Sequence, residues 1–103
     1  IEECVFRNRR GKRGMKFNDI TEEMNALYER KNHDYGNSFS ETFRKLGIIS
    51  AATRMLDKMN RIVSLVTKDY QKVNDESLRD TLIDIANYAV MTIMEIDKKK
   101  ERI

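Results

Sequence analysis

Residues 75–91 have the sequence DESLRDTLIDIANYAVM, which predicts a helix with two different faces. Successive residues of a helix are about 100° apart, so apolar side chains gather along one stripe and polar side chains along another. The apolar stripe consists of Leu78, Leu82, Ile85, Ala89, Ile93 and Ile96, and the opposite stripe of Glu76, Asp80, Asp84, Asn87 and Met91. Further apolar residues flank the acids, so we expect these carboxylates to be partly enclosed and to need a cation or hydrogen-bond donors.

The oxygen-rich stripe of this helix predicts a site for a hard divalent cation. Mg²⁺ binds a few carboxylates together with waters and phosphate oxygens, and side chains one helical turn apart can supply such ligands. The expected Mg²⁺ ligands are Glu76, Asp80, Asp84 and Asn87. The simpler interpretation is an acidic face in contact with solvent, and the sequence leaves both interpretations open.

A helix expected over residues 48–68 carries the complementary charge. Its predicted core stripe consists of Met55, Leu56, Met59, Ile62, Val63 and Val66, and its basic stripe of Arg54, Lys58 and Arg61. Cations with this spacing are suited to the phosphates of a ligand. The alternative is a solvated surface on which they form ordinary salt bridges.

The remaining elements complete an all-α fold. A first helix is expected from about Asn18 to Lys31, with Asp19 and Glu22 as a capping box, and a short helix over residues 40–46 that ends at Gly47. The chain has no proline and only four glycines, which argues against a turn-rich sheet protein. We therefore expect a bundle of three long helices and one short helix.

Polar and small residues between the first two helices predict a loop over residues 31–39. Such a loop could close over the base or sugar of a nucleotide. The residues expected to do so are Asp34, Tyr35, Gly36, Asn37, Ser38 and Phe39.

Length and composition set further limits. A chain of 103 residues forms one domain, expected over residues 15–103, and is small enough for a homodimer to help it bury surface. No apolar run reaches the roughly 20 residues of a membrane span. The lone Cys4 cannot form an intramolecular disulfide, which fits the cytoplasm. The sequence contains no glycine-rich phosphate loop and no nucleophile motif, so it identifies no catalytic residue.

The formal charge of +3 resides entirely in residues 1–14, where five basic residues stand against two acidic ones. The rest of the chain is neutral and lacks the basic footprint of a nucleic-acid-binding domain, so nucleic acid is the least expected partner. The codons of Gly11 to Gly14 would resemble a bacterial ribosome-binding site, which suggests the hypothesis that Met15 is the natural start.

Three blocks carry a resemblance to a known family. They are DYGNSF at residues 34–39, DKMNRI at residues 57–62, and DES at residues 75–77 leading to DIANYA at residues 84–89. In this order they resemble the small phage and prophage family called nucleotide modification associated domain 1. The resemblance implies a role in phage nucleotide or DNA-base metabolism inside a bacterial host, and it supplies no reaction.

A more distant similarity is to the MazG-like all-helical nucleoside triphosphate pyrophosphohydrolases, around Leu78 to Ala89. It implies Mg²⁺-dependent hydrolysis, with Asp80 at the position of a metal-binding aspartate. The departures are Ser77 in place of a glutamate, and Glu22 with Asn25 in place of a first glutamate pair. We therefore expect a protein that binds a nucleotide or deoxynucleotide, with pyrophosphohydrolase activity as one possibility. The alternative is a non-enzymatic accessory protein that sequesters a nucleotide or binds a host protein.

Overall fold

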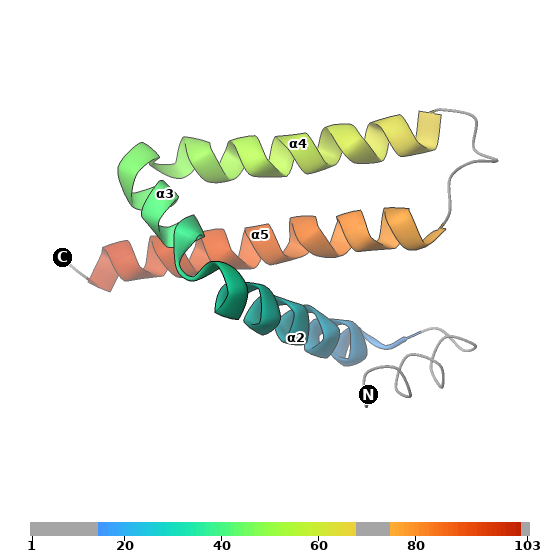
Figure 1. The fold of residues 1–103 in the computed structure, drawn as a ribbon, viewed down its shortest axis with the longest axis horizontal. Coiled ribbons are helices and arrows are strands. Elements are labelled where there is room, and N and C mark those ends of the chain that lie inside the picture. The colour runs from blue at the N-terminus through green and yellow to red at the C-terminus, as the bar shows by residue number, and fades with distance from the viewer. Residues whose placement is uncertain (1–14, 68–74, 102–103) are drawn as a thin grey trace. The chain divides into compact units, whose positions relative to one another are not determined.

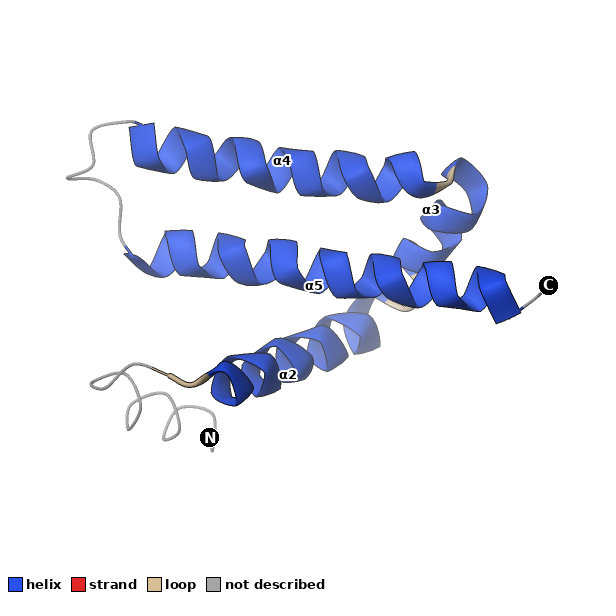
Figure 2. Ribbon diagram, turned by 180° about the vertical axis from the view of Figure 1, so that it is seen from behind, coloured by secondary structure: helices blue, strands red, loops and turns tan. Residues whose placement is uncertain are grey.

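The computed structural model describes residues 15–67 and 75–101, and all of its regular elements in these ranges are helices (Figure 1). In chain order they are α2 (Phe17–Tyr35), α3 (Ser38–Leu46), α4 (Ile48–Thr67) and α5 (Asp75–Glu101). Figure 2 shows no strand in the described ranges, which confirms the all-α prediction. The basic arm predicted at residues 1–14 and the connection before α5 lie outside these ranges. No helix in them is long and apolar enough to cross a membrane.

The chain divides into two compact units, Ile1–Gly36 and Asn37–Ile103. The first contains α2, whose start differs from the predicted one. Asp19 is not the residue before the helix: it lies in the first turn, where its carboxylate accepts the backbone N–H of Lys16 at 3.0 Å. A carboxylate in this place satisfies a donor that the helix itself leaves unpaired.

The loop predicted over residues 31–39 is mostly helical, so that expectation was wrong in extent. Helix α2 continues to Tyr35, and only Gly36 and Asn37 separate it from α3. Asn and Asp weaken a helix by only a fraction of a kcal/mol each. Gly36 ends the helix, because its φ of 67° is one that other residues rarely adopt, and its N–H bonds to the carbonyl of Asn32 at 2.8 Å.

In the second unit, α3 ends at Gly47 as predicted. The N–H of Gly47 donates to the Phe43 carbonyl at 2.7 Å. The helix contributes Phe39 and Phe43, one turn apart, to the core. They pack with Ala51, which is 0% exposed, and the partly buried residues around them are Met55, Tyr88 and Met91. The small side chain of Ala51 therefore lies where α3, α4 and α5 come together.

Helices α4 and α5 lie side by side and antiparallel (Figures 1 and 2). Two contacts fix their register. Lys58 is opposite Asp84, and one turn further along α4, Arg61 is opposite Thr81.

The apolar stripe predicted as the core of α4 is mostly exposed, although its member Met55 packs against the buried core, and the predicted stripe of α5 is at most half-buried. The prediction that these stripes form the core was therefore wrong for most of their residues. Leu82 and Ile93 on α5, and Leu56 and Met59 on α4, all remain about half exposed. The face of α5 that meets α3 and α4 is the adjacent one, with Thr81, Asp84 and Tyr88. Periodicity finds an apolar stripe, but it does not say which neighbour that stripe will cover.

Candidate functional site

The acidic stripe of α5 and the basic stripe of α4 meet along one side of the α4–α5 pair. Lys58 Nζ lies 3.1 Å from Asp84 Oδ2, with the two side chains 31% and 20% exposed. This contact is the salt bridge that the alternative interpretation of the basic stripe expected. A half-buried pair is screened less than a surface pair, so each charge depends on the other more strongly than at the surface.

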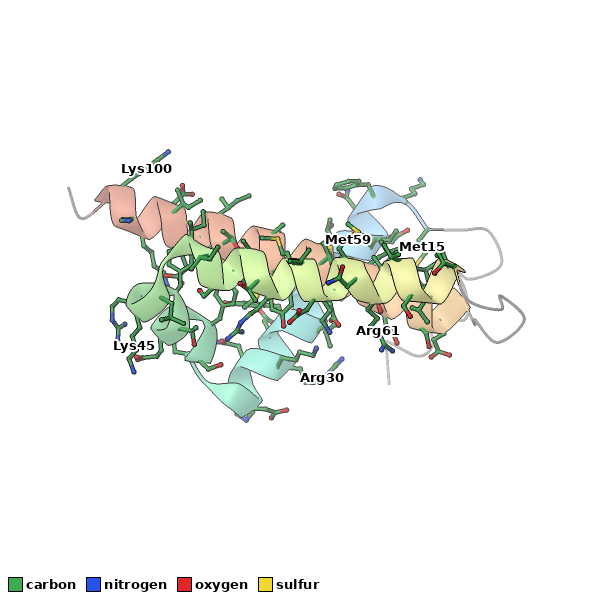
Figure 3. All side chains as sticks on the ribbon, turned by 90° about the horizontal axis from the view of Figure 1, so that it is seen from above. Met15, Arg30, Lys45, Met59, Arg61 and Lys100 are labelled. Carbon is green, nitrogen blue, oxygen red and sulfur yellow. The ribbon has the colours of Figure 1, made fainter. Side chains whose placement is uncertain are left out.

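Arg61 extends the same row by one turn. Its Nε donates to Thr81 Oγ1 at 3.3 Å, and that hydroxyl in turn donates to the Ser77 carbonyl at 2.9 Å. Arg61 is an exposed residue. In Figure 3, Arg61 and Met59 point to opposite sides of α4, which separates a polar side from an apolar side. The guanidinium group has five donor hydrogens, so the bond to Thr81 leaves capacity for a phosphate.

Arg54, the third predicted phosphate ligand, has a different environment. Its guanidinium carbon lies 5.3 Å from the centroid of the Phe39 ring, a cation–π contact. Phe39 stacks on Tyr88 with centroids 6.0 Å apart and on Phe43 with centroids 6.4 Å apart. Arg54 therefore covers one side of the aromatic core while its charge stays near the surface.

The residues predicted to form a nucleotide-binding loop do not act as one segment. Asp34 and Tyr35 belong to the last turn of α2, Gly36 and Asn37 form the turn, and Ser38 and Phe39 begin α3. The side chains of Asp34, Asn37 and Ser38 are exposed, whereas Phe39 is buried in the core. Phe39 is thus placed to hold α3 against α4 and α5.

The predicted Mg²⁺ ligands follow one side of α5. Glu76 and Asp80 are exposed, and Asp84 and Asn87 are half-buried. Within the described ranges, no three His, Cys, Asp or Glu side chains form a group that could hold a metal ion. Mg²⁺ at phosphate sites commonly uses only one or two carboxylates and takes its other ligands from phosphates and water. Asp80 and Asp84 therefore fit a site shared with a bound phosphate better than a closed protein cage.

A polar bridge between α3 and α5 was not found from the sequence. Ser40 Oγ donates to Glu95 Oε2, and Lys98 Nζ donates to the same carboxylate oxygen at 3.0 Å. The Glu95 side chain is only 10% exposed. The three-residue spacing of Glu95 and Lys98 indicates half of this bridge. Nothing in the sequence links Ser40 to Glu95, because they are 55 residues apart.

A model of the family described as nucleotide modification associated domain 1 matches residues 31–96. The chain belongs to this family. The matched segment contains α3, α4 and most of α5, and with them every residue assigned above to a metal, phosphate or loop site. The family's description connects it with nucleotide modification and names no reaction. Comparison with curated proteins gave no match, and comparison with solved structures gave none either. The similarity to MazG-like enzymes stays a prediction.

Proposed function

We propose that the protein binds a nucleotide or deoxynucleotide on the polar side of the α4–α5 pair, with Mg²⁺ as a shared ion. The observation that supports this most is the pairing of Lys58 with Asp84 one turn from the exposed Arg61, which places cations and carboxylates in adjacent rows. Family membership adds the connection with nucleotides.

Each residue has a definite part in the proposal. Arg61 contacts a phosphate with the donors that Thr81 does not use, and Lys58 contacts the next phosphate. Asp80 and Asp84 would hold the ion, which would neutralise phosphate charge. Lys58 would contact a phosphate oxygen, because its flexible four-carbon stem lets the ammonium group reorient. A dimer would carry two such sites.

Two outcomes of binding remain within this proposal. Hydrolysis of a nucleoside triphosphate to a monophosphate and pyrophosphate would follow the MazG-like similarity. Sequestration of the nucleotide without turnover is the alternative outcome. An accessory role of this kind in phage nucleotide metabolism needs affinity alone.

Calorimetric titration with each deoxynucleoside triphosphate, with and without Mg²⁺, tests the proposal. The matched variants are Arg61→Ala and Arg44→Ala. Arg44 is also exposed, but on α3, where it pairs with Glu41 at 2.7 Å. A hydrogen bond to a charged group contributes about 1.5–3 kcal/mol, so Arg61→Ala should weaken binding by at least about tenfold. Arg44→Ala should leave it unchanged.

Pyrophosphate release in the same mixtures separates hydrolysis from sequestration. Turnover that Asp80→Asn abolishes would support the enzyme, and tight binding without release would support the sequestering protein. Equal affinity of the Arg61→Ala and Arg44→Ala variants, or no binding of any nucleotide, would overturn the assignment of this site.

A further inference from the structure

The α4–α5 pair has a large exposed apolar face, on the side opposite the polar residues. Its most exposed side chains are between 48% and 65% accessible. They are Ile49, Leu56, Met59, Val63 and Val66 on α4, and Leu82 and Ile93 on α5. We refer to these seven residues as the apolar face. They recur with the helical period on both helices, which distinguishes them from scattered surface residues.

The two halves of this face form one continuous surface. The register set by Lys58–Asp84 and Arg61–Thr81 brings Met59 to the level of Leu82, near the centre of the pair. By the same register Leu56 is level with Ile85, and Val63 with Leu78. On each helix the apolar stripe lies beside the face that contacts the other helix. Because the helices are antiparallel, two stripes displaced in the same rotational sense from these contact faces lie on the same side of the pair.

The apolar face carries no charge along its length. The stripe positions are 49, 52, 56, 59, 63 and 66 in α4, and 78, 82, 85, 89, 93 and 96 in α5, and none holds Asp, Glu, Lys or Arg. On the other side of α4, in contrast, Lys58 and Arg61 engage α5 through polar contacts. A charged ligand or a nucleic acid would thus find no counter-charge on the apolar face. A partner that binds this face must itself present an apolar surface.

The size of the face matches one subunit's share of a protein interface. Seven large side chains at about half exposure leave an apolar patch on the order of several hundred Å², more than soluble monomers commonly expose in one place. A standard stable interface takes about 800 Å² from each partner. With the half-buried residues between them, the two stripes extend over most of both helices and approach this area.

We propose that the apolar face is the interface between two copies of this chain. In a twofold contact the same surface of both subunits packs together. An uncharged apolar surface of sufficient area can therefore bind a second copy of itself. Two such pairs packed face to face give a four-helix arrangement with α4 and α5 of each copy, a geometry in which apolar stripes interdigitate. The polar side with Lys58 and Asp84 points away from the interface in each copy. The proposal therefore does not depend on nucleotide binding.

Light scattering coupled to gel filtration tests the interface. The chain has a mass of 12.2 kDa, and the expected species has twice that mass over a range of protein concentrations. Met59→Lys places a charge at the centre of the face and should give a monomer with an unchanged helical circular dichroism spectrum. Asp57→Lys is the matched control, because it places the same side chain at an exposed position of α4 away from the face.

The outcomes separate the proposal from its alternatives. A wild-type monomer at all concentrations would mean that part of the same chain covers the face, and would overturn the proposal. A dimer that survives Met59→Lys would overturn it as well. If Met59→Lys loses its helical spectrum, the uncharged variant Met59→Gln replaces it. The dissociation constant of the dimer should then rise at least tenfold relative to Asp57→Lys, and an equal value would refute the interface.

Discussion

Replacing Phe39 with alanine should show whether this residue stabilises the core or contacts a ligand. The ring is buried, stacks on Phe43 and Tyr88, and is covered by the Arg54 guanidinium. A buried Phe→Ala change costs about 3–5 kcal/mol, through lost transfer free energy and a cavity. For a domain of this size 1 kcal/mol corresponds to about 4–8 °C, so Tm should fall by at least about 12 °C.

The control for this experiment is the same substitution at Phe17, which is 82% exposed. Phe17→Ala should change stability by no more than about 0.5 kcal/mol. Both variants are unfolded with urea and by heat at one protein concentration, because association would make Tm concentration-dependent. Similar losses of stability in Phe39→Ala and Phe17→Ala would show that the core assignment is mistaken. A third variant, Phe39→Leu, tests the other role: loss of nucleotide affinity without loss of stability would show that Phe39 contacts a ligand.

Two further substitutions test the energetics of the α3–α4–α5 unit. Asp84→Asn should lower the free energy of unfolding by about 1–2 kcal/mol with or without Mg²⁺, because the half-buried Lys58 loses its counter-charge. The same change at the exposed Asp80 should alter it by less than about 0.5 kcal/mol. Equal losses for the two variants in urea denaturation would contradict the Lys58–Asp84 pairing. Gly47→Ala should lower the free energy of unfolding by about 1–3 kcal/mol, because Gly47 has φ 82° and ψ −170°, a region essentially restricted to glycine. The loss would come from the backbone alone, since nothing within 4 Å obstructs an added Cβ. An unchanged midpoint of urea denaturation would show that the backbone relaxes there without strain.

The helices themselves were largely predictable from the sequence. Gly47 ended α3 as expected, the ends expected for α4 lie within one residue of the observed ones, and α5 begins at Asp75, the first residue of the predicted helical stretch. The end of α2 was missed by four residues. Asn32, His33 and Asp34 resemble loop residues, but they weaken a helix only slightly, and the decisive signal was the single Gly36.

The direction in which each helix faces was less predictable. The polar stripes of α4 and α5 were expected to carry complementary charges, and the structure brings one residue of each together in the Lys58–Asp84 pair. The core was then assigned to the larger apolar stripes, although α4 and α5 meet through adjacent faces. That choice depends on how several helices share one small core around Ala51, and a one-dimensional pattern does not contain this information.

The two sides of the α4–α5 pair explain why α5 has two stripes at all. A helix that only covered the core would need one apolar face, with polar residues over the rest of its surface. Helix α5 instead meets α4 through an ion pair and a hydrogen bond as well as the apolar packing around Ala51, and it leaves Leu82 and Ile93 about half exposed. Substitutions on the apolar side should therefore alter association, and those on the polar side should alter ligand binding.

The Lys58–Asp84 pair also determines which ligand the proposed site on the polar side would prefer. Removing Lys58 from a half-buried carboxylate costs free energy, because both charges lose a close partner in a poorly screened place. If the proposed site is correct, Mg²⁺ alone would compensate the charge of Asp84 but not that of Lys58, and a phosphate alone would compensate only the charge of Lys58. A nucleotide together with its ion would compensate both charges at once, so the proposed site predicts tighter binding of the joint ligand than of either component. In the proposed site the ion pair would contribute specificity for a metal–phosphate complex, and the exposed Arg61 would add affinity that needs no such exchange.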